Sequence, residues 1–449
     1  MEEELLRSWE ELARILPDTA RFNEKGHLVI GGCDVADLAA RFGTPLYIFD
    51  EETIRNRCRE FRREFSSRYD SLLIIYAAKA FLCRALARII REEGLGLDVV
   101  SWGEMAAALS SSFPPRLIYF HGNNKSPEEL ELALEQGVGR IVVDNLFELE
   151  ILERIARSKG KVQEILLRLN PGIDPHTHRY IATGAADSKF GLPIAGGQAE
   201  EAVRSALSSP NLELLGFHVH IGSQIKDTRP FAEAARILIE FCARMREKYG
   251  FLPEELDLGG GFAIPYTRGE EVPSIGDYAR AITSALRESL ERFDLPAPRL
   301  VLEPGRAIVG RAGIALYRVG ALKEIPGVRS YIFVDGGMGD NIRPALYQAR
   351  YEAIPADKLF EPPKGKKTVA GRYCESGDIL VRDAELPDLA PGDLIAVPVA
   401  GAYCIPMSSN YNHNPRPAIV MTSGGRAFLI RRRESAEDLL KLDLLPEEA

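Results

Sequence analysis

The sequence predicts a (β/α)8 barrel followed by a mainly β domain, and three observations lead to this fold. Eight short apolar runs alternate with helical stretches between residues 72 and 305, which is the order and length that a barrel requires. The first run has no Gly-rich loop after it, whereas an open doubly wound sheet carries one there. From about Arg318 onward, short strand-like runs separated by Gly and Pro replace the alternation. We therefore predict domains over 1–46, 47–317 and 318–449.

Residues 1–46 are predicted to be a lead-in whose strands join the β domain. The chain opens with MEEELLRSWEELARIL, which has a helical period, and continues to the short strand HLVIGG. The stretch GTPLYIFDEET follows, in which Asp50 or Thr53 is placed to cap a helix through Arg63. The chain therefore enters the barrel at about residue 47.

The eight predicted barrel strands end in residues that carry chemistry. The runs are LLIIYAAK, LGLDVVS, LIYFH, RIVVD, EILLRLN, LLGFHVH, ELDLGGG and RLVLEPG, ending at Lys79, Ser101, His121, Asp144, Asn170, His220, Gly261 and Gly305. Helix signals lie between them, such as the capped start from Ser126 to Glu129 and the amphipathic run 229–249. Because barrel strands end on one face, we expect a set of polar strand ends to converge there: Lys79, Ser101, His121, Asn170, His220, Gly259 to Gly261 and Glu303.

Lys79 follows the first apolar run directly. A run that is apolar on both faces needs cover on both sides, so a lysine at its carboxyl end lies at the rim of a dry core. Desolvation there lowers the pKa of an amine and makes it nucleophilic. The alternative is a lysine whose stem lies on apolar surface while its head reaches water, and taken alone this is the better interpretation. The other strand ends favour the nucleophile, because they supply partners for a Schiff base.

Composition and charge exclude several classes of function. The formal net charge of −9 and the sequence pI near 5.5 leave no basic stripe for a nucleic acid, so a small-molecule substrate is expected. No 18-residue apolar run and no signal peptide are found, so we expect a cytoplasmic protein without membrane contacts. The six cysteines form no CxxC pair, which argues against a zinc or redox site, and no metal is expected.

A series of ordered motifs along nearly the whole chain resembles the fold-type III pyridoxal phosphate-dependent decarboxylases, in particular those that act on diaminopimelate. The motifs are GTPLYIFD, YAAKA, GLGLDVVS, HGNNKSPEEL, DSKFG, GFHVHIGSQ, DLGGGF, EPGR, RPALY, CESGD, GAY, MSSNYN and RPAIV. The resemblance implies an alanine racemase-like barrel with a C-terminal β domain and bound pyridoxal 5'-phosphate. It also implies conversion of meso-2,6-diaminopimelate to L-lysine and carbon dioxide, the last step of lysine biosynthesis.

The resemblance assigns the catalytic and cofactor-binding roles. Lys79 would hold the cofactor as a Schiff base, and Cys374 would donate the proton that quenches the carbanion. Glu303 would keep the pyridine nitrogen protonated, so that the ring accepts the electron pair left by carbon dioxide. Glu303 as a helix N-terminal anion is the alternative, which the EPGR context weakens. The remaining cofactor contacts would come from His220 stacked on the ring, Ser223, Gly259, Gly260, Gly261, Gly305, Arg306 and Tyr403.

The glycine triple and the histidine pair each have a second interpretation. Gly259 to Gly261 fit the phosphate site that barrels often build from their last loops, although a triple alone is as well explained by a flexible turn. His218 lies two residues before His220, hence on the same strand face, and is predicted to be structural.

Substrate recognition must satisfy the second amino acid group of diaminopimelate, which carries a carboxylate and an ammonium. By resemblance, Arg306, Arg343 and Tyr347 would hold the carboxylate, Glu375 the ammonium, and Tyr403 would touch both cofactor and substrate. An ornithine or arginine decarboxylase faces a purely cationic end and has no use for these arginines. A surface ion pair is the alternative for Arg343. The resemblance also implies a homodimer in which Lys79, His220 and Glu303 of one chain meet Cys374 and Glu375 of the other.

Four other functions use some of the same residues. A metal-dependent hydrolase would use His218 and His220 as an HxH pair, but that pair belongs on the first strand. An alanine racemase relative would not need an electron sink as strong as Glu303, and a non-catalytic pyridoxal phosphate-binding protein would not need the β domain. A related decarboxylase of another amino acid with a distal carboxylate stays open. The chain departs from the family pattern at Trp102, where glycine is usual, and at Phe81, where asparagine is usual.

Overall fold

The computed structural model describes residues 9–173 and 188–446. They divide into two compact units: Met1–Ile54, Pro265–Glu271 and Ile308–Ala449 form one, and Arg55–Ile264 with Val272–Ala307 form the other. The start of the predicted N-terminal helix and the aspartate of the DSKFG motif lie outside the described residues. Within the described ranges, we find no helix long and apolar enough to cross a membrane.

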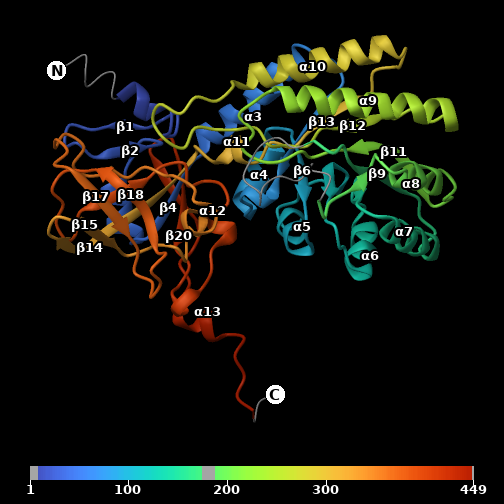
Figure 1. The fold of residues 1–449 in the computed structure, drawn as a ribbon. Coiled ribbons are helices and arrows are strands. Elements are labelled where there is room, and N and C mark those ends of the chain that lie inside the picture. The colour runs from blue at the N-terminus through green and yellow to red at the C-terminus, as the bar shows by residue number, and fades with distance from the viewer. Residues whose placement is uncertain (1–8, 174–187, 447–449) are drawn as a thin grey trace. The chain divides into compact units, whose positions relative to one another are not determined.

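The second unit is a closed barrel of eight parallel strands, which confirms the predicted fold (Figure 1). The strands pair in sequence order, and β9 pairs with both β8 and β11 while β13 pairs with β5, so that the sheet has no free edge. Ile75, Val142, Leu166 and Val301 belong to a cluster of buried side chains from different strands. Each strand matches one of the eight apolar runs: β5 (Leu72–Ala77), β6 (Gly96–Val99), β7 (Ile118–Phe120), β8 (Arg140–Val143), β9 (Gln163–Asn170), β11 (Leu212–His218), β12 (Glu255–Asp257) and β13 (Arg299–Leu302).

The helices between the strands begin and end at residues that the sequence marks. Ser126 and Glu129 form a capping box at the start of α6, and Gly137 in the left-handed conformation ends it. Asp50 accepts the backbone N–H of Thr53 at the start of α3, so the aspartate is the cap. The helices in order are α3 (Glu51–Ser66), α4 (Arg84–Glu92), α5 (Trp102–Leu109), α6 (Pro127–Gln136), α7 (Leu146–Ser158), α8 (Gln198–Leu207), α9 (Arg229–Tyr249), α10 (Ile275–Arg292) and α11 (Arg306–Val309).

A buried ionic network occupies the amino ends of the barrel strands. Glu255 at the start of β12 accepts hydrogen bonds from Arg140 at 2.9 and 3.0 Å, from Arg299 at 2.9 Å and from the Tyr119 hydroxyl at 3.0 Å. Every partner of this carboxylate is a donor, so the buried charge is compensated. This end of the barrel therefore serves stability, and the chemistry is left to the carboxyl ends.

The first unit is mainly β. Its large sheet has the order β18-β17-β15-β14-β4-β20-β21, with β19 on β14 and β16 on β19. The strands are β4 (Leu46–Asp50), β14 (Gly313–Ile325), β15 (Arg329–Val334), β16 (Ile354–Pro355), β17 (Lys366–Ala370), β18 (Ile379–Glu385), β19 (Leu394–Val397), β20 (Ala418–Ser423) and β21 (Arg426–Arg431). The N-terminal strands β1 (Arg21–Phe22), β2 (Leu28–Ile30) and β3 (Cys33–Asp34) form a separate three-stranded sheet in the same unit, and α2 (Val35–Phe42) follows them.

The division of the chain differs in detail from the predicted domain bounds. β4 pairs with β14 and β20, so residues 46–50 complete the large β sheet although 47–317 was predicted as barrel. Residues 265–271 also belong to the β unit, although the chain reaches them between β12 and α10 of the barrel. The apolar pattern did not predict that residues 46–50 belong to the β unit, because β4 is as apolar as a barrel strand.

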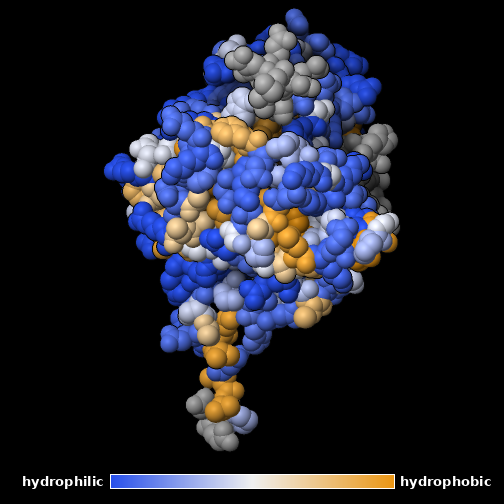
Figure 2. All heavy atoms as spheres, turned by 90° about the vertical axis from the view of Figure 1, so that its left-hand side faces the viewer, coloured by the Kyte–Doolittle hydropathy of each residue, from blue (hydrophilic) through white to orange (hydrophobic). Residues whose placement is uncertain are grey.

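The C-terminal segment has a short helix and an apolar surface. Its helix, α13, spans only Ala436–Leu440. Figure 2 shows apolar side chains gathered along this segment, where Leu440, Leu442, Leu444 and Leu445 are 55 to 88% exposed.

Candidate active site

Lys79 lies directly after β5, in a short 3-10 turn at Ala78–Ala80. Its Nζ is 3.2 Å from Oδ2 of Asp98 on β6, and the aspartate is fully buried whereas the lysine side chain is 37% exposed. The sequence predicted a lysine at the rim of a dry core. In the structure a buried carboxylate on the neighbouring strand contacts the amine, and solvent also reaches the lysine side chain.

Glu303 is held by two buried histidines. It follows β13, and its Oε1 lies 2.9 Å from Nε2 of His121, while its Oε2 lies 3.5 Å from Nε2 of His218. The two imidazole rings meet edge to face at 4.9 Å. Asp98 extends the cluster, because its Oδ1 is 3.8 Å from Nε2 of His121. A chain of polar contacts therefore runs from Lys79 through Asp98 and His121 to Glu303.

The charges of this cluster are set by burial and by one another. Burial alone would raise the pKa of Glu303, but His121 and His218 outweigh it and hold that pKa well below its usual range. Asp257, at the end of β12, is buried beside Glu303, and burial followed by the glutamate's charge raises the pKa of Asp257 well above normal. Burial also lowers the pKa of His218 to about 3. The cluster therefore favours the charged form of Glu303 and disfavours the charged forms of Asp257 and His218.

His220 lies two residues beyond the end of β11 and contacts a different group from His218. Its Nδ1 accepts the backbone N–H of Gly260 at 3.1 Å. Burial of the ring and the positive charge of Lys79 lower the pKa of His220 well below normal. The ring is thus a neutral imidazole near Lys79.

The glycine triple is required by close backbone packing. A Cβ on Gly260 would lie 2.2 Å from the carbonyl oxygen of Glu303, and Gly259 and Gly261 have φ of +67° and +107°. The amide of Gly259 donates to Asp257 at 2.8 Å, and that of Gly260 donates to His220. Two of the three predicted phosphate donors are therefore used within the barrel, and the loop is a shaped turn and not a flexible one.

Two further predicted cofactor residues meet each other. Nη2 of Arg306, at the start of α11, donates to the hydroxyl of Ser223 at 3.0 Å, and Arg306 is 6% exposed. Gly305 lets this turn pass close to β5, since a Cβ there would lie 3.0 Å from that of Ala77. The EPGR motif thus presents Glu303 and a buried arginine side by side.

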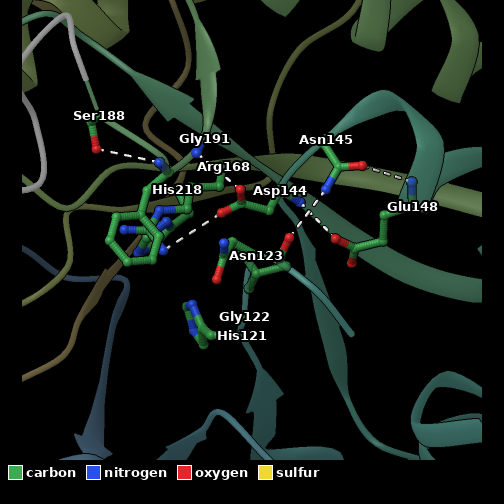
Figure 3. Close-up of polar contacts among 12 residues, drawn as sticks. His121, Gly122, Asn123, Asp144, Asn145, Glu148, Arg168, Ser188, Gly191 and His218 are labelled. Carbon is green, nitrogen blue, oxygen red and sulfur yellow. Dashed lines mark hydrogen bonds and ion pairs between the residues drawn. The ribbon is translucent and has the colours of Figure 1, made fainter. Parts of the chain in front are cut away.

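Asp144 and Arg168 form a second polar group at the ends of β8 and β9 (Figure 3). Nη1 of Arg168 lies 3.6 Å from Oδ1 of Asp144, whose other oxygen accepts the N–H of Gly191 at 3.1 Å. The guanidinium also lies 4.5 Å from the ring centre of Phe190. These contacts anchor the SKFG residues of the DSKFG motif. Burial lowers the pKa of Arg168, which Asp144 and Glu303 partly offset.

Two of the predicted polar strand ends serve the backbone. Ser101 caps α5 by accepting the N–H of Glu104 at 3.2 Å, and Asn170 accepts the N–H of Gly172 at 2.9 Å. Glu104 itself interacts electrostatically with Asp98, Lys79 and His121. Burial, with a contribution from Asp98, raises the pKa of Glu104 to about 7, although Lys79 and His121 act in the opposite direction.

The β unit gathers three of the predicted substrate residues around one guanidinium. Arg343 starts α12 (Arg343–Tyr347) and is 7% exposed. The Cζ of Arg343 lies 6.0 Å from the ring centres of both Tyr347 and Tyr403. Tyr403 holds a left-handed backbone with φ of +63°, a strained conformation of the kind found at functional sites. The predicted alternative for Arg343, a surface ion pair, is wrong because the side chain is buried.

Cys374 and Glu375 lie on an exposed turn of the β unit. The amide of Cys374 donates to Oδ1 of Asn412 at 3.1 Å, and its carbonyl accepts the hydroxyl of Tyr411 at 3.5 Å. The CESGD and MSSNYN motifs are therefore neighbours. Of the two departures from the family pattern, Phe81 is buried and its carbonyl accepts the hydroxyl of Tyr76, whereas Trp102 is 37% exposed at the start of α5.

Sequence reasoning gave no role to Asp98 or Asp257, placed His121 among the converging strand ends without a specific contact, and predicted His218 to be structural. A charged residue inside an apolar run, as in LGLDVV and ELDLGG, was the available signal for both aspartates. His121, His218 and Glu303 bring three possible metal-ligand atoms within 4.8 Å of one another. The same carboxylate and imidazole atoms could also bind a polar group of an organic ligand, such as an N–H donor.

Comparisons with known proteins point to one chemistry. The family model described as pyridoxal-dependent decarboxylase, pyridoxal binding domain, matches residues 51–310. The diaminopimelate decarboxylase of Bacillus subtilis (strain 168) is 48% identical over 96% of this chain and 98% of its own length. That of Mycobacterium bovis is 44% identical over 96% and 98%. The crystal structure of diaminopimelate decarboxylase from M. jannaschii in complex with L-lysine superposes with a TM-score of 0.90, at 36% identity over 96% and 98% of the two chains.

Proposed function

This chain belongs to the family of pyridoxal-dependent diaminopimelate decarboxylases, and from that premise we propose which of its residues carry out the decarboxylation of meso-2,6-diaminopimelate to L-lysine and carbon dioxide. One observation carries the proposal. Glu303 is a buried, ionised carboxylate at the end of β13, and β13 pairs with β5, the strand that leads into Lys79. A ring that accepts electrons from the substrate needs an amine to hold it at one side and a carboxylate to keep its nitrogen protonated at the other, and these two neighbouring strands supply both.

The cofactor of the proposed reaction is pyridoxal 5'-phosphate, and the donor set fits it. When bound, it supplies the ring that accepts the electron pair of the lost carboxyl group. Lys79 would hold its aldehyde carbon, and Glu303 its pyridine nitrogen. Glu303 is buried beside His121 and His218, which favour its ionised form, so the carboxylate suits a protonated ring nitrogen. Ser223 and Arg306 would hold the phosphate, together with the amide of Gly261.

The surrounding residues keep each group in the required charge state. His121 and His218 hold Glu303 ionised in a site where burial would otherwise protonate it. The raised pKa of Asp257 favours its protonated form beside Glu303, which reduces the repulsion between the two carboxyl groups. Asp98 fixes the amine of Lys79 at 3.2 Å. We infer that Cys374 delivers the proton to the carbon from which carbon dioxide leaves.

The far end of the substrate is proposed to bind the β unit. Arg343 is buried, and among the described residues its side chain bonds to tyrosine hydroxyls and to no carboxylate. A buried cation without an anion is costly, so the distal carboxylate of diaminopimelate is a suitable partner. Arg306 and Tyr347 would share that carboxylate, Glu375 would take the distal ammonium, and Tyr403 would contact cofactor and substrate. Cadaverine, which is L-lysine without its carboxyl group, could not make the contact with Arg343.

Product analysis tests the proposed function. Holoenzyme incubated with meso-diaminopimelate is expected to release carbon dioxide and L-lysine in equal amounts. L-Ornithine, L-arginine and L-lysine should be turned over at least about 10³-fold less efficiently, because they leave the buried arginine unpaired. The measurement is labelled carbon dioxide release with chromatographic identification of the amine. Comparable turnover of L-ornithine would contradict the assigned substrate.

We also propose that the active site is completed across a homodimer in the cytoplasm, with Lys79, His220 and Glu303 from one chain and Cys374 and Glu375 from the other. The exposed turn that carries Cys374 and Glu375 supports this, because a proton donor for a dry site needs cover that a second chain can supply.

Mixing two inactive variants tests the shared site. If Lys79→Ala and Glu375→Ala chains assort freely, half the dimers are mixed, and each mixed dimer has one intact site. Activity should then recover to about a quarter of the wild-type value. The measurement is L-lysine formation after co-expression, with native mass spectrometry to quantify mixed dimers. Mixed dimers that remain as inactive as either parent would show that both residues act within one chain.

A further inference from the structure

Arg343 uses one of its two terminal nitrogens entirely on tyrosines. Nη1 donates to the hydroxyl of Tyr266 at 2.9 Å and to that of Tyr351 at 2.5 Å. The two tyrosine rings pack edge to face, with centres 5.3 Å apart and an interplanar angle of 88°. Both tyrosines are buried, at 7 and 5% exposure. The guanidinium therefore sits in a rigid aromatic corner.

This arrangement decides which edge of the guanidinium can bind a ligand. Arginine has five N–H donors in a fixed fork, and two of them belong to Nη1. Since both Nη1 donors point to tyrosines, the donors left for a ligand are those of Nη2 and Nε. Nε is buried and has no hydrogen-bond partner among the residues that the structure describes. A carboxylate lying along the Nε–Nη2 edge would satisfy two parallel donors at once.

Tyr351 also connects this corner to the turn that carries Tyr403. Its hydroxyl lies 3.6 Å from the Sγ of Cys404, the residue after Tyr403. Because the oxygen accepts the proton of Arg343, it can donate its own proton to the sulfur. Loss of the Tyr351 hydroxyl would therefore remove one hydrogen bond from the Arg343 guanidinium and one contact from the turn at Cys404.

We propose that Tyr266 and Tyr351 are positioning residues that determine specificity for a substrate whose distal end carries a carboxylate. They hold Arg343 so that its Nε–Nη2 edge receives that carboxylate, and without them the guanidinium turns to satisfy Nη1 elsewhere. This inference rests on the proposed function of Arg343. The ligand class is an α-amino acid group at the end of an aliphatic chain, as in diaminopimelate and L-lysine.

Competitive binding to the holoenzyme separates the carboxylate contact from the rest of the site. L-Lysine carries the distal carboxylate and cadaverine is the same chain without it, so inhibition constants against meso-diaminopimelate are measured for both. Tyr351→Phe and Tyr266→Phe are each expected to raise the constant for L-lysine, and the KM for diaminopimelate, about tenfold or more. The constant for cadaverine and kcat should stay within about threefold of wild type.

Two reference variants make the result decisive. Tyr317→Phe removes another buried hydroxyl of the same unit, one bonded to Asp340 at 2.5 Å and not to Arg343, and it should leave both inhibition constants unchanged. Arg343→Ala should raise the L-lysine constant at least as much as either tyrosine variant. If Arg343→Ala does so while both tyrosine variants bind L-lysine like wild type, the inference is overturned and the proposed function stands. If Arg343→Ala also binds L-lysine normally, both are overturned.

Discussion

Replacing Lys79 with alanine is expected to reduce kcat/KM for meso-diaminopimelate by about 10⁴-fold or more, because the reaction loses the amine that holds and releases the cofactor. The rest of the site should survive. Asp98 loses the amine at 3.2 Å, but it lies on a buried barrel strand whose packing does not depend on Lys79. The far-ultraviolet circular dichroism spectrum should therefore match that of wild type. Steady-state carbon dioxide release over a wide range of enzyme concentrations measures the loss.

Lys159→Ala is the matched control for this variant. That lysine pairs with Glu131 and Glu135 on the helical surface of the barrel, and such exposed pairs contribute little. Its kcat/KM should stay within about twofold of wild type. If Lys79→Ala kept a tenth of the wild-type activity, another amine would have to carry the cofactor.

Changing Glu303 to glutamine is expected to lower kcat by roughly 10²- to 10³-fold, with a smaller effect on KM. The substitution keeps the size of the side chain but removes the negative charge that lies 2.9 Å from His121 and 3.5 Å from His218. Removing one group that stabilises developing charge in a buried site typically costs about 10²- to 10³-fold in kcat, which is the basis of this range. The bound cofactor should also absorb at a different wavelength, since the amide cannot keep the ring nitrogen protonated.

Glu303→Asp distinguishes charge from shape. The aspartate keeps the negative charge beside His121 but shortens the reach, so its activity should lie between those of wild type and glutamine. Absorbance spectra and kcat are recorded for both variants at saturating cofactor. A glutamine variant with wild-type spectrum and turnover would contradict the role of Glu303 as the charge that controls the ring.

The barrel was predictable because its signal is local. Each apolar run, such as LLIIYA before Lys79 and RLVL before Glu303, became one strand, since a strand covered on both faces must be apolar at every position. The convergence of strand ends then follows from topology alone, which brought Lys79, His121 and Glu303 into one group.

The position of His218 was not predictable by the same rule. Residues two apart share a face only while the strand continues, and β11 ends at His218. His220 lies beyond it and turns to Gly260, while His218 faces Glu303. The prediction that the two histidines share a strand face assumed a strand two residues longer, whereas they contact different groups.

The surroundings of Arg343 had no sequence signal. Tyr266 lies in residues 265–271. This segment follows a barrel strand and precedes a barrel helix in the sequence, yet it belongs to the β unit. Tyr351 lies eight residues after Arg343, outside any regular element, and is brought back by the fold. Contacts of this kind depend on long-range packing, so only the RPALY and GAY motifs pointed to the site.

Borohydride reduction of the holoenzyme tests the central claim, that Lys79 at the end of β5 holds the cofactor in a site governed by Glu303. Reduction converts the linkage to a stable amine, and proteolysis followed by mass spectrometry locates it. The account predicts loss of the visible absorbance and one modified peptide, spanning YAAKAF with the label on Lys79. A label on any other lysine, or a holoenzyme that has full activity and no reducible linkage, would contradict it.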